Sequence, residues 1–252
     1  MKQTILILLL LLAVPLAAQE QDSEAPQEGQ ASQEQNSQEQ AEQEWTPRTP
    51  SELAAESDYV VLAQLDIYKY EKRRDIPVSG DSWFDVLVPY KVPRPVERFK
   101  VVEEGFGERK CYFEADRWSE MPRYLLFLVD YPDGEAGEVR GHPDGCALSV
   151  LATTDNRYVV RWPIENMRFE TDVESLVEEF EFQGPGATVD LSDRIGFRRE
   201  EEVERLFLEP VENDDRGRDF IYRYTRGIPL GVFREEVIGT EHLTRDRVQR
   251  GG

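Results

Sequence analysis

The sequence predicts a mainly β protein, in which a small antiparallel barrel of five to six strands carries a helical C-terminal extension. Two observations predict this fold class. Short segments of alternating apolar and polar residues, with Pro- and Gly-rich turns between them, fill residues 49–165, as in compact antiparallel barrels and sandwiches. After Pro163 the apolar residues recur at helical spacing instead. We therefore expect a helical extension over residues 166–240 and a flexible tail over residues 241–252.

The first 18 residues have the pattern of a secretory signal. Lys2 supplies a positive charge, residues 5–14 form an apolar run, and small residues follow it up to Ala18. Such a run is about half the ~20 residues of a membrane-spanning helix. We therefore expect cleavage near Gln19 and no stable membrane insertion afterwards. No cysteine stands at the cleavage point to accept a lipid, and the pattern predicts a secreted or periplasmic protein.

Residues 19–48 are predicted to be a disordered linker. Their first 26 positions, residues 19–44, hold nine Gln and eight acidic residues, and neither Lys nor Arg. A segment of this composition has too little apolar surface to bury. It would separate the barrel from whatever holds the N-terminus.

The net charge of −21 limits the partners. Residues 45–252 carry −14 of it and residues 19–44 carry −8, against +1 in the signal. Nucleic-acid binding requires cations that neutralise phosphates, so we expect no nucleic-acid partner. Anionic membranes are disfavoured for the same reason. The expected partner is an unidentified protein or glycan of the cell envelope, and no cofactor is predicted.

The two cysteines, Cys111 and Cys146, predict one disulfide. Exported chains pass through an oxidising compartment, where two cysteines commonly form a disulfide. A redox-active pair is more often spaced Cys-x-x-Cys, and that motif is absent. A structural disulfide closing this loop is worth roughly 3.8 kcal/mol in the chain-entropy model.

The barrel region begins with a helix start signal. Thr49-Pro50-Ser51-Glu52 fits a capping box with proline at the first helical position, and the helix should reach about Glu56. Strands are then expected at 59–70, 85–92, 96–102, 111–113, 123–129, 146–152 and 157–162. Residues 123–129 are apolar on both faces, which predicts a central strand.

Two helices are expected in the extension. Thr171 and Glu174 form a second capping box, and apolar residues at helical spacing follow, which predicts a helix over about 172–183 that ends at Gly184. We expect it to cover an edge or an open end of the barrel. A shorter helix is expected over about 199–208, and one further strand over 220–224.

Three segments resemble the netrin-like domains, the family that includes tissue inhibitors of metalloproteinases. They are Ser57-Asp58-Tyr59-Val60-Val61-Leu62-Ala63, Phe99-Lys100-Val101-Val102-Glu103-Glu104-Gly105 and Arg123-Tyr124-Leu125-Leu126-Phe127-Leu128, with a cysteine after the last. The resemblance covers about residues 51–165. It implies a five-stranded barrel of the oligonucleotide/oligosaccharide-binding (OB) type and a secreted interaction module. Inhibitory members of this family bind the catalytic zinc of their target through an N-terminal cysteine. This chain has no cysteine near Gln19, so the resemblance implies no transferable site.

No residue pattern predicts a catalytic or metal site. Common zinc-protease, phosphate-binding and serine-hydrolase motifs are absent, and the only histidines are His142 and His242. Acidic residues admit two weaker alternatives. Asp116 and Glu120 flank Trp118 as in a sugar site, and one loop holds carboxylates that suit Ca²⁺, namely Asp130, Asp133, Glu135 and Glu138. Solvated acidic loops explain both patterns more simply.

Aromatic residues are the remaining candidate interaction sites, because OB-type barrels bind through aromatic platforms. The candidates are Tyr68, Tyr90, Tyr112 and Trp118, although strand tyrosines more often serve packing. The function expected from all these observations is an exported, non-catalytic interaction module. The alternatives are a secreted carboxylate-dependent hydrolase of cell-wall polysaccharide and a protease inhibitor acting through a loop.

Overall fold

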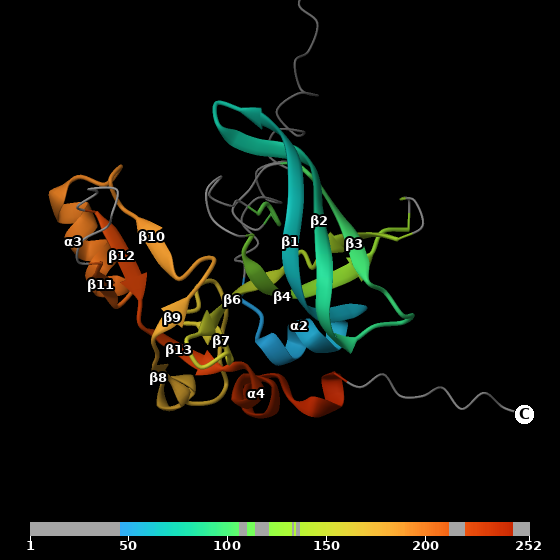
Figure 1. The fold of residues 1–252 in the computed structure, drawn as a ribbon. Coiled ribbons are helices and arrows are strands. Elements are labelled where there is room, and N and C mark those ends of the chain that lie inside the picture. The colour runs from blue at the N-terminus through green and yellow to red at the C-terminus, as the bar shows by residue number, and fades with distance from the viewer. Residues whose placement is uncertain are drawn as a thin grey trace, which may run out of the picture. The chain divides into compact units, whose positions relative to one another are not determined.

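Five strands close into a barrel in the structure, a computed structural model that describes residues 46–105, 110–113, 121–132, 134, 137–211 and 220–243. They are β1 (Tyr59–Arg73), β2 (Ile76–Lys91), β3 (Arg98–Glu104), β4 (Arg123–Asp130) and β5 (Glu138–Gly141). Their order is β1-β2-β3-β5-β4, and β4 pairs with β1 to close the ring (Figure 1). The predicted small β barrel is confirmed.

The barrel is mixed, whereas the sequence pattern predicted an antiparallel barrel. β3 and β5 run parallel, and the other four pairings are antiparallel. A closed ring of alternating strand directions needs an even number of strands. Five strands therefore force one parallel pair.

The barrel sheet continues on one side into the C-terminal half of the chain. β6 (Ala147–Thr153) pairs with β4, then come β7 (Tyr158–Arg161), β13 (Arg226–Pro229) and β8 (Glu178–Glu179), and β9 (Phe182–Gln183) pairs with β6. The extension is thus joined to the barrel by β13. Gly227 allows this pairing, because a Cβ there would collide with the Val159 side chain and the Val160 carbonyl.

A separate three-stranded sheet follows in the extension. β12 (Ile221–Tyr224) lies between β10 (Thr188–Asp190) and β11 (Leu208–Pro210), and α3 (Gly196–Arg205) precedes β11. Its small core packs around Leu151 of β6. The predicted strand at 220–224 is confirmed.

Two larger cores share β1 and β4. Residues of one face fill the barrel interior, including Val61, Phe84 and Leu126. The opposite face of β1 and β4 packs under α2 (Pro50–Glu56), α4 (Leu230–Val232) and the π-helical turn η2 (Phe233–Ile238). β4 is therefore buried on both faces, as its apolar run predicted.

The helix predicted over 172–183 is wrong. Only a 3₁₀ turn, η1 (Val173–Leu176), forms there, without a side-chain cap, and β8 and β9 follow. Strand pairing replaces the predicted helix here. The Phe180 N–H donates to the Thr225 carbonyl, and Glu178 pairs with Gly227 of β13. Glu174 and Glu178 would also repel each other across one helical turn.

Four further elements differ from expectation. Residues 111–113 belong to no strand. The helix expected over 199–208 spans 196–205, and β11 starts at Leu208. β2 starts at Ile76 rather than at Asp85. At the C-terminus, the expected tail begins inside a 3₁₀ turn, η3 (Thr240–His242), and the next residue, Leu243, is buried.

Cys111 and Cys146 form the predicted disulfide, with their Cα atoms 6.2 Å apart. It joins residues 111–113 to the start of β6. Gly141 lies against it, and a Cβ there would collide with Cys111 Sγ. Beside it, the buried Glu103 carboxylate accepts hydrogen bonds from the Cys111 N–H and from Lys110 Nζ. The disulfide thus ties residues 111–113 covalently to the start of β6, and the buried charge of Glu103 beside it is paired.

Candidate functional site

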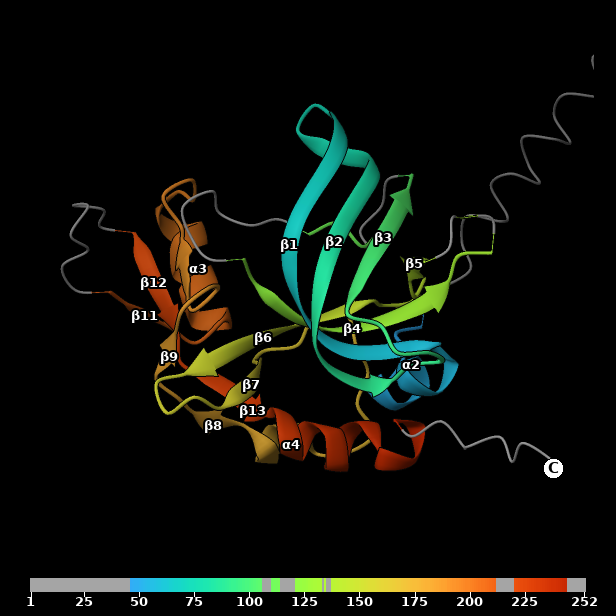
Figure 2. The same ribbon diagram turned by 45° about the vertical axis from the view of Figure 1, so that its right-hand side comes forward.

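The β1–β2 hairpin extends beyond the barrel as an arm, which we define as residues 66–81 (Figure 2). β1 pairs with β4 only up to Gln64, and nine more residues follow, a length of roughly 30 Å at strand geometry. β2 pairs with β3 from Ser79 onward. Residues 72–78, the arm tip, therefore pair only with each other among the described strands.

The turn at the arm tip has the backbone of a tight hairpin. Arg74 and Asp75 have φ values of 50° and 66°, the left-handed region that two-residue hairpin turns use. Aspartate tolerates this region better than most residues. The turn directs Lys72, Arg73 and Arg74 outward with Ile76, and all four side chains are exposed. A cationic tip thus projects from a strongly acidic protein.

Three tyrosines cluster where the arm meets the barrel. The rings of Tyr68 and Tyr70 stack with centroids 5.2 Å apart, and Tyr112 meets Tyr70 edge-on at 5.0 Å. The Tyr70 hydroxyl accepts a hydrogen bond from the Phe113 N–H. Burial, together with the nearby Glu103 carboxylate, raises the pKa of Tyr112, so its neutral hydroxyl donates to the Gly105 carbonyl. Residues 111–113, which the disulfide holds, therefore contact the base of the arm at Tyr70.

The four predicted aromatic candidates do not form one platform. The structure brings Tyr68 and Tyr112 together through Tyr70. Tyr90 lies on the second core, under the Arg234 guanidinium, which is 4.4 Å from its ring centroid. Burial raises the pKa of Tyr90. Trp118 lies outside the described residues.

Trp83, which was not among the predicted aromatic candidates, lies on the outer face of β2. Lys69 Nζ and Lys100 Nζ lie 5.5 and 5.9 Å from its ring centroid. Lys100 also contacts Glu138 at 2.7 Å and Asp81 at 3.2 Å, and the hydrogen bond to Glu138 is the main reason that its pKa is raised. These paired charges make the face around Trp83 nearly neutral.

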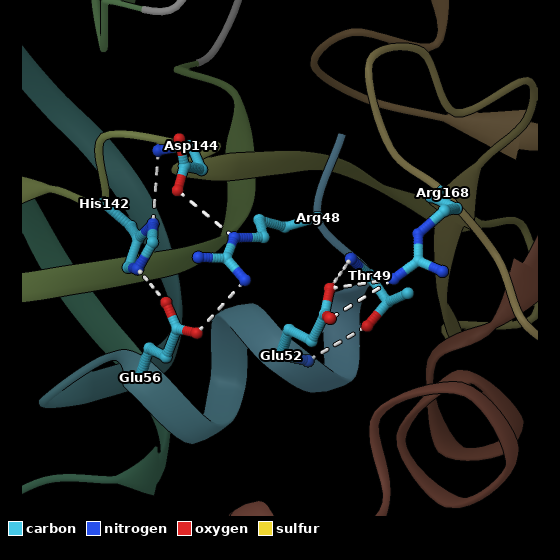
Figure 3. Close-up of polar contacts among 7 residues, drawn as sticks. All are labelled: Arg48, Thr49, Glu52, Glu56, His142, Asp144 and Arg168. Carbon is cyan, nitrogen blue, oxygen red and sulfur yellow. Dashed lines mark hydrogen bonds and ion pairs between the residues drawn. The ribbon is translucent and has the colours of Figure 1, made fainter. Parts of the chain in front are cut away.

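A polar network fixes α2 at the other end of the barrel (Figure 3). The predicted capping box is present, because Thr49 Oγ1 accepts from the Glu52 N–H and the Glu52 carboxylate accepts from the Thr49 N–H. The latter bond is the main reason that the pKa of Glu52 is lowered. Arg168 lies 3.2 Å from the same carboxylate.

The C-terminal end of α2 is held by a second part of this network. Glu56 contacts Arg48 at 3.5 Å and His142 Nε2 at 3.4 Å. His142 is buried, and its Nδ1 accepts from the Asp144 N–H. Both ring nitrogens thus face a partner within the fold (Figure 3), which gives this histidine a role in joining α2 to the loop before Cys146.

A pocket of about 290 Å³, the α2 groove, opens beside the N-terminus of α2. Four acidic residues line it, namely Glu170, Glu235, Glu236 and Glu241, and its apolar wall comes from the half-buried Phe169 and Val237. The volume is just below the ~300–1,000 Å³ of ordinary ligand pockets. It therefore suits one or two side chains better than a cofactor.

The described residues bring together neither of the alternative acidic sites. Asp116, Glu120, Asp133 and Glu135 lie outside them, so the sugar-site and Ca²⁺ patterns stay predictions. Within the described ranges, no group of three or more His, Cys, Asp or Glu residues is placed to hold a metal ion. His242 lies 3.6 Å from the neighbouring Glu241.

Comparison with family models, curated proteins and solved structures finds no match to this chain. In the part of the chain that the structure describes, no helix combines the length and the apolar character of a membrane-spanning segment.

The arm tip is the functional candidate that the sequence analysis missed, although a signal for it exists. Lys72, Arg73 and Arg74 are the only three consecutive cations in the sequence. Pro77 and Gly80 made the start of β2 hard to recognise from the sequence, because both residues are rare inside strands. Recognising a strand on each side of the cationic run would have predicted a charged hairpin tip.

Proposed function

We propose that this chain is an exported, non-catalytic interaction module that contacts its partner through the arm tip. The observation that carries the proposal is the cationic tip at residues 72–78, which pairs only with itself among the described strands. Strand length beyond the barrel adds little to a hydrophobic core. Exposed cations in an acidic chain supply directional attraction to an acidic surface.

The surroundings of the arm support a binding role. Its base is braced by the tyrosine cluster and by the disulfide-linked segment, so the tip is held in a defined direction. Pre-organised elements lose less conformational entropy on binding. Ile76, which is 54% exposed, supplies an apolar contact beside the arginines.

The signal-like first 18 residues and the Gln/Glu-rich segment support export and display on a linker. The oxidised Cys111–Cys146 pair is in keeping with an oxidising compartment. The resemblance to netrin-like domains supports the same class of function, a secreted interaction module with an OB-type barrel.

Partner capture from the native cell envelope tests the proposal. The mature protein should retain a defined partner that mass spectrometry identifies, and the variant Arg73→Glu/Arg74→Glu should lose it. Arg194→Glu/Arg198→Glu is the matched control, because both arginines are exposed on or beside α3 and the charge change is equal. Equal capture by both variants would refute a role of the tip.

A protease inhibitor acting through a loop is the second candidate. It is favoured by the exposed Arg73-Arg74 pair, which matches proteases that select basic residues. The left-handed φ of Arg74 argues against it, because peptides bound as added strands are extended. Incubation with a trypsin-like protease separates the two candidates. A loop inhibitor would block the protease at equimolar concentration, whereas an interaction module would not slow it.

A further inference from the structure

The α2 groove has the chemistry of a receptor for a basic side chain beside an apolar one. Among the described residues, Glu235 and Glu236 have no cation within ion-pair distance, whereas Glu170 is 3.7 Å from Arg168. Phe169 and Val237 form part of the apolar wall next to these carboxylates. The groove is therefore suited to a projecting segment that presents both kinds of side chain.

The arm tip of the same chain presents both. Arg73 and Arg74 are exposed and adjacent, and Ile76 follows them across the turn with 54% of its surface exposed. The groove volume of about 290 Å³ matches one or two side chains, which is what a two-residue turn can insert. Charge and apolar surface thus complement each other.

Within one molecule the two features cannot meet. The arm points away from one end of the barrel, while α2 and α4 lie at the opposite end in both views (Figures 1 and 2). We propose that the arm tip of one copy docks in the α2 groove of a second copy. This inference rests on the proposed function, because it names the partner of the same arm.

Such a contact is heterologous, since it joins two different surfaces. Each copy keeps one unused tip and one unused groove after the first contact, so assembly continues head to tail into rings or open chains. The general repulsion between two acidic copies is screened beyond about 8 Å at physiological salt. Close ion pairs in a partly enclosed groove are screened less.

The expected self-association is weak. Exposed ion pairs contribute little each, and the groove admits few side chains. We expect a dissociation constant of about 10⁻⁵ to 10⁻³ M, with loss of association at about 1 M salt. Display of the chain at high local concentration would compensate for a constant in this range.

Analytical ultracentrifugation of the mature chain tests the proposal with charge-swapped variants. The wild type should show an average mass that rises beyond the dimer with concentration. Arg73→Glu/Arg74→Glu and Glu235→Arg/Glu236→Arg should each stay monomeric when measured alone. An equimolar mixture should associate again, because each altered surface then meets its opposite charge. Unchanged circular dichroism and melting temperature establish that both variants fold.

Arg194→Glu/Arg198→Glu is the control and should associate like the wild type. A wild type that stays monomeric up to about 1 mM, or a mixture that fails to associate, overturns the self-docking. If the arm variant nevertheless loses an envelope partner that the wild type retains, only the second-copy inference fails and the interaction function stands. If the arm variant loses neither self-association nor an envelope partner, both the self-docking and the interaction function are refuted.

Discussion

The two halves of β1 differ sharply although they form one continuous strand. Residues 59–65 are buried with the single exception of Gln64, whereas residues 66–73 are exposed except for the half-buried Tyr68 and Tyr70. The first half has β4 on one side and helices over its outer face. The second half lacks both among the described residues. One strand thus serves stability at its base and, as we propose, recognition at its end.

Side chains at the base fill two cores, so their loss leaves cavities, whereas the side chains of residues 72–76 are exposed. Substitutions at the base should lower the stability of the fold and should have no selective effect on partner binding. Substitutions at the tip should change binding without changing folding.

Truncation of the base should have the largest effect. Leu62 is fully buried opposite Leu125 of β4, and Leu62→Ala should lower the free energy of unfolding by about 2–5 kcal/mol. Ile76→Ala at the tip is the matched control and should change it by less than about 0.5 kcal/mol. Urea unfolding measures both, and similar losses would contradict the division of β1.

Removal of the disulfide should come next. Cys111→Ser with Cys146→Ser should cost about 2–4 kcal/mol, because the unfolded chain regains the freedom of the closed loop. It should also loosen the segment that supports Tyr70. Unfolding with and without reductant measures the loss, and a wild type insensitive to reductant would show that the bond is not formed in solution.

The base of β1 could be predicted from the sequence, whereas the second strand of the arm was not recognised. Residues 59–63 and the run 123–129 are apolar on both faces, which identifies strands buried on both sides. Capping by Thr49 and Glu52 is a local interaction, so it could be predicted as well. The arm required β2 to begin at Ile76, where Pro77 and Gly80 weaken the strand pattern.

Long-range pairing also overrode local periodicity in the extension. Residues 172–183 have helical spacing, but β13 offers them strand partners from a segment nearly 50 residues later. Arg226-Gly227-Ile228-Pro229 has no strand pattern, because its pairing depends on the missing side chain of Gly227. The α2 groove was equally hidden, since residues 49–51, 169–171 and 235–241 meet only after folding.

The cap of α2 should have a smaller effect than the base residues that it covers. Thr49→Ala removes the hydroxyl that accepts from the Glu52 N–H, which should cost about 0.5–2 kcal/mol. Thr49→Ser keeps the acceptor and should lose much less. Equal losses in thermal unfolding would show that the methyl group, rather than the cap, matters.

The smallest expected effect is a pH dependence at Glu52. Its folded-state pKa is lowered from 4.5, chiefly by the hydrogen bond from the Thr49 N–H. The charged form therefore stabilises the fold above the unfolded pKa, and this contribution disappears as pH falls through the folded pKa. The stability difference between wild type and Glu52→Gln should shrink from about pH 6 to about pH 3. A constant difference would contradict this role of the carboxylate.

Site-specific photocrosslinking in the native envelope tests the role of the arm most directly. A photoreactive residue replaces Asp75 at the tip, and in a parallel sample it replaces Asp193, which is also exposed and lies beside α3. We expect a discrete crosslinked product from position 75 and none from position 193. No product from position 75, or the same products from both positions, would contradict the claim that the arm tip is the contact surface.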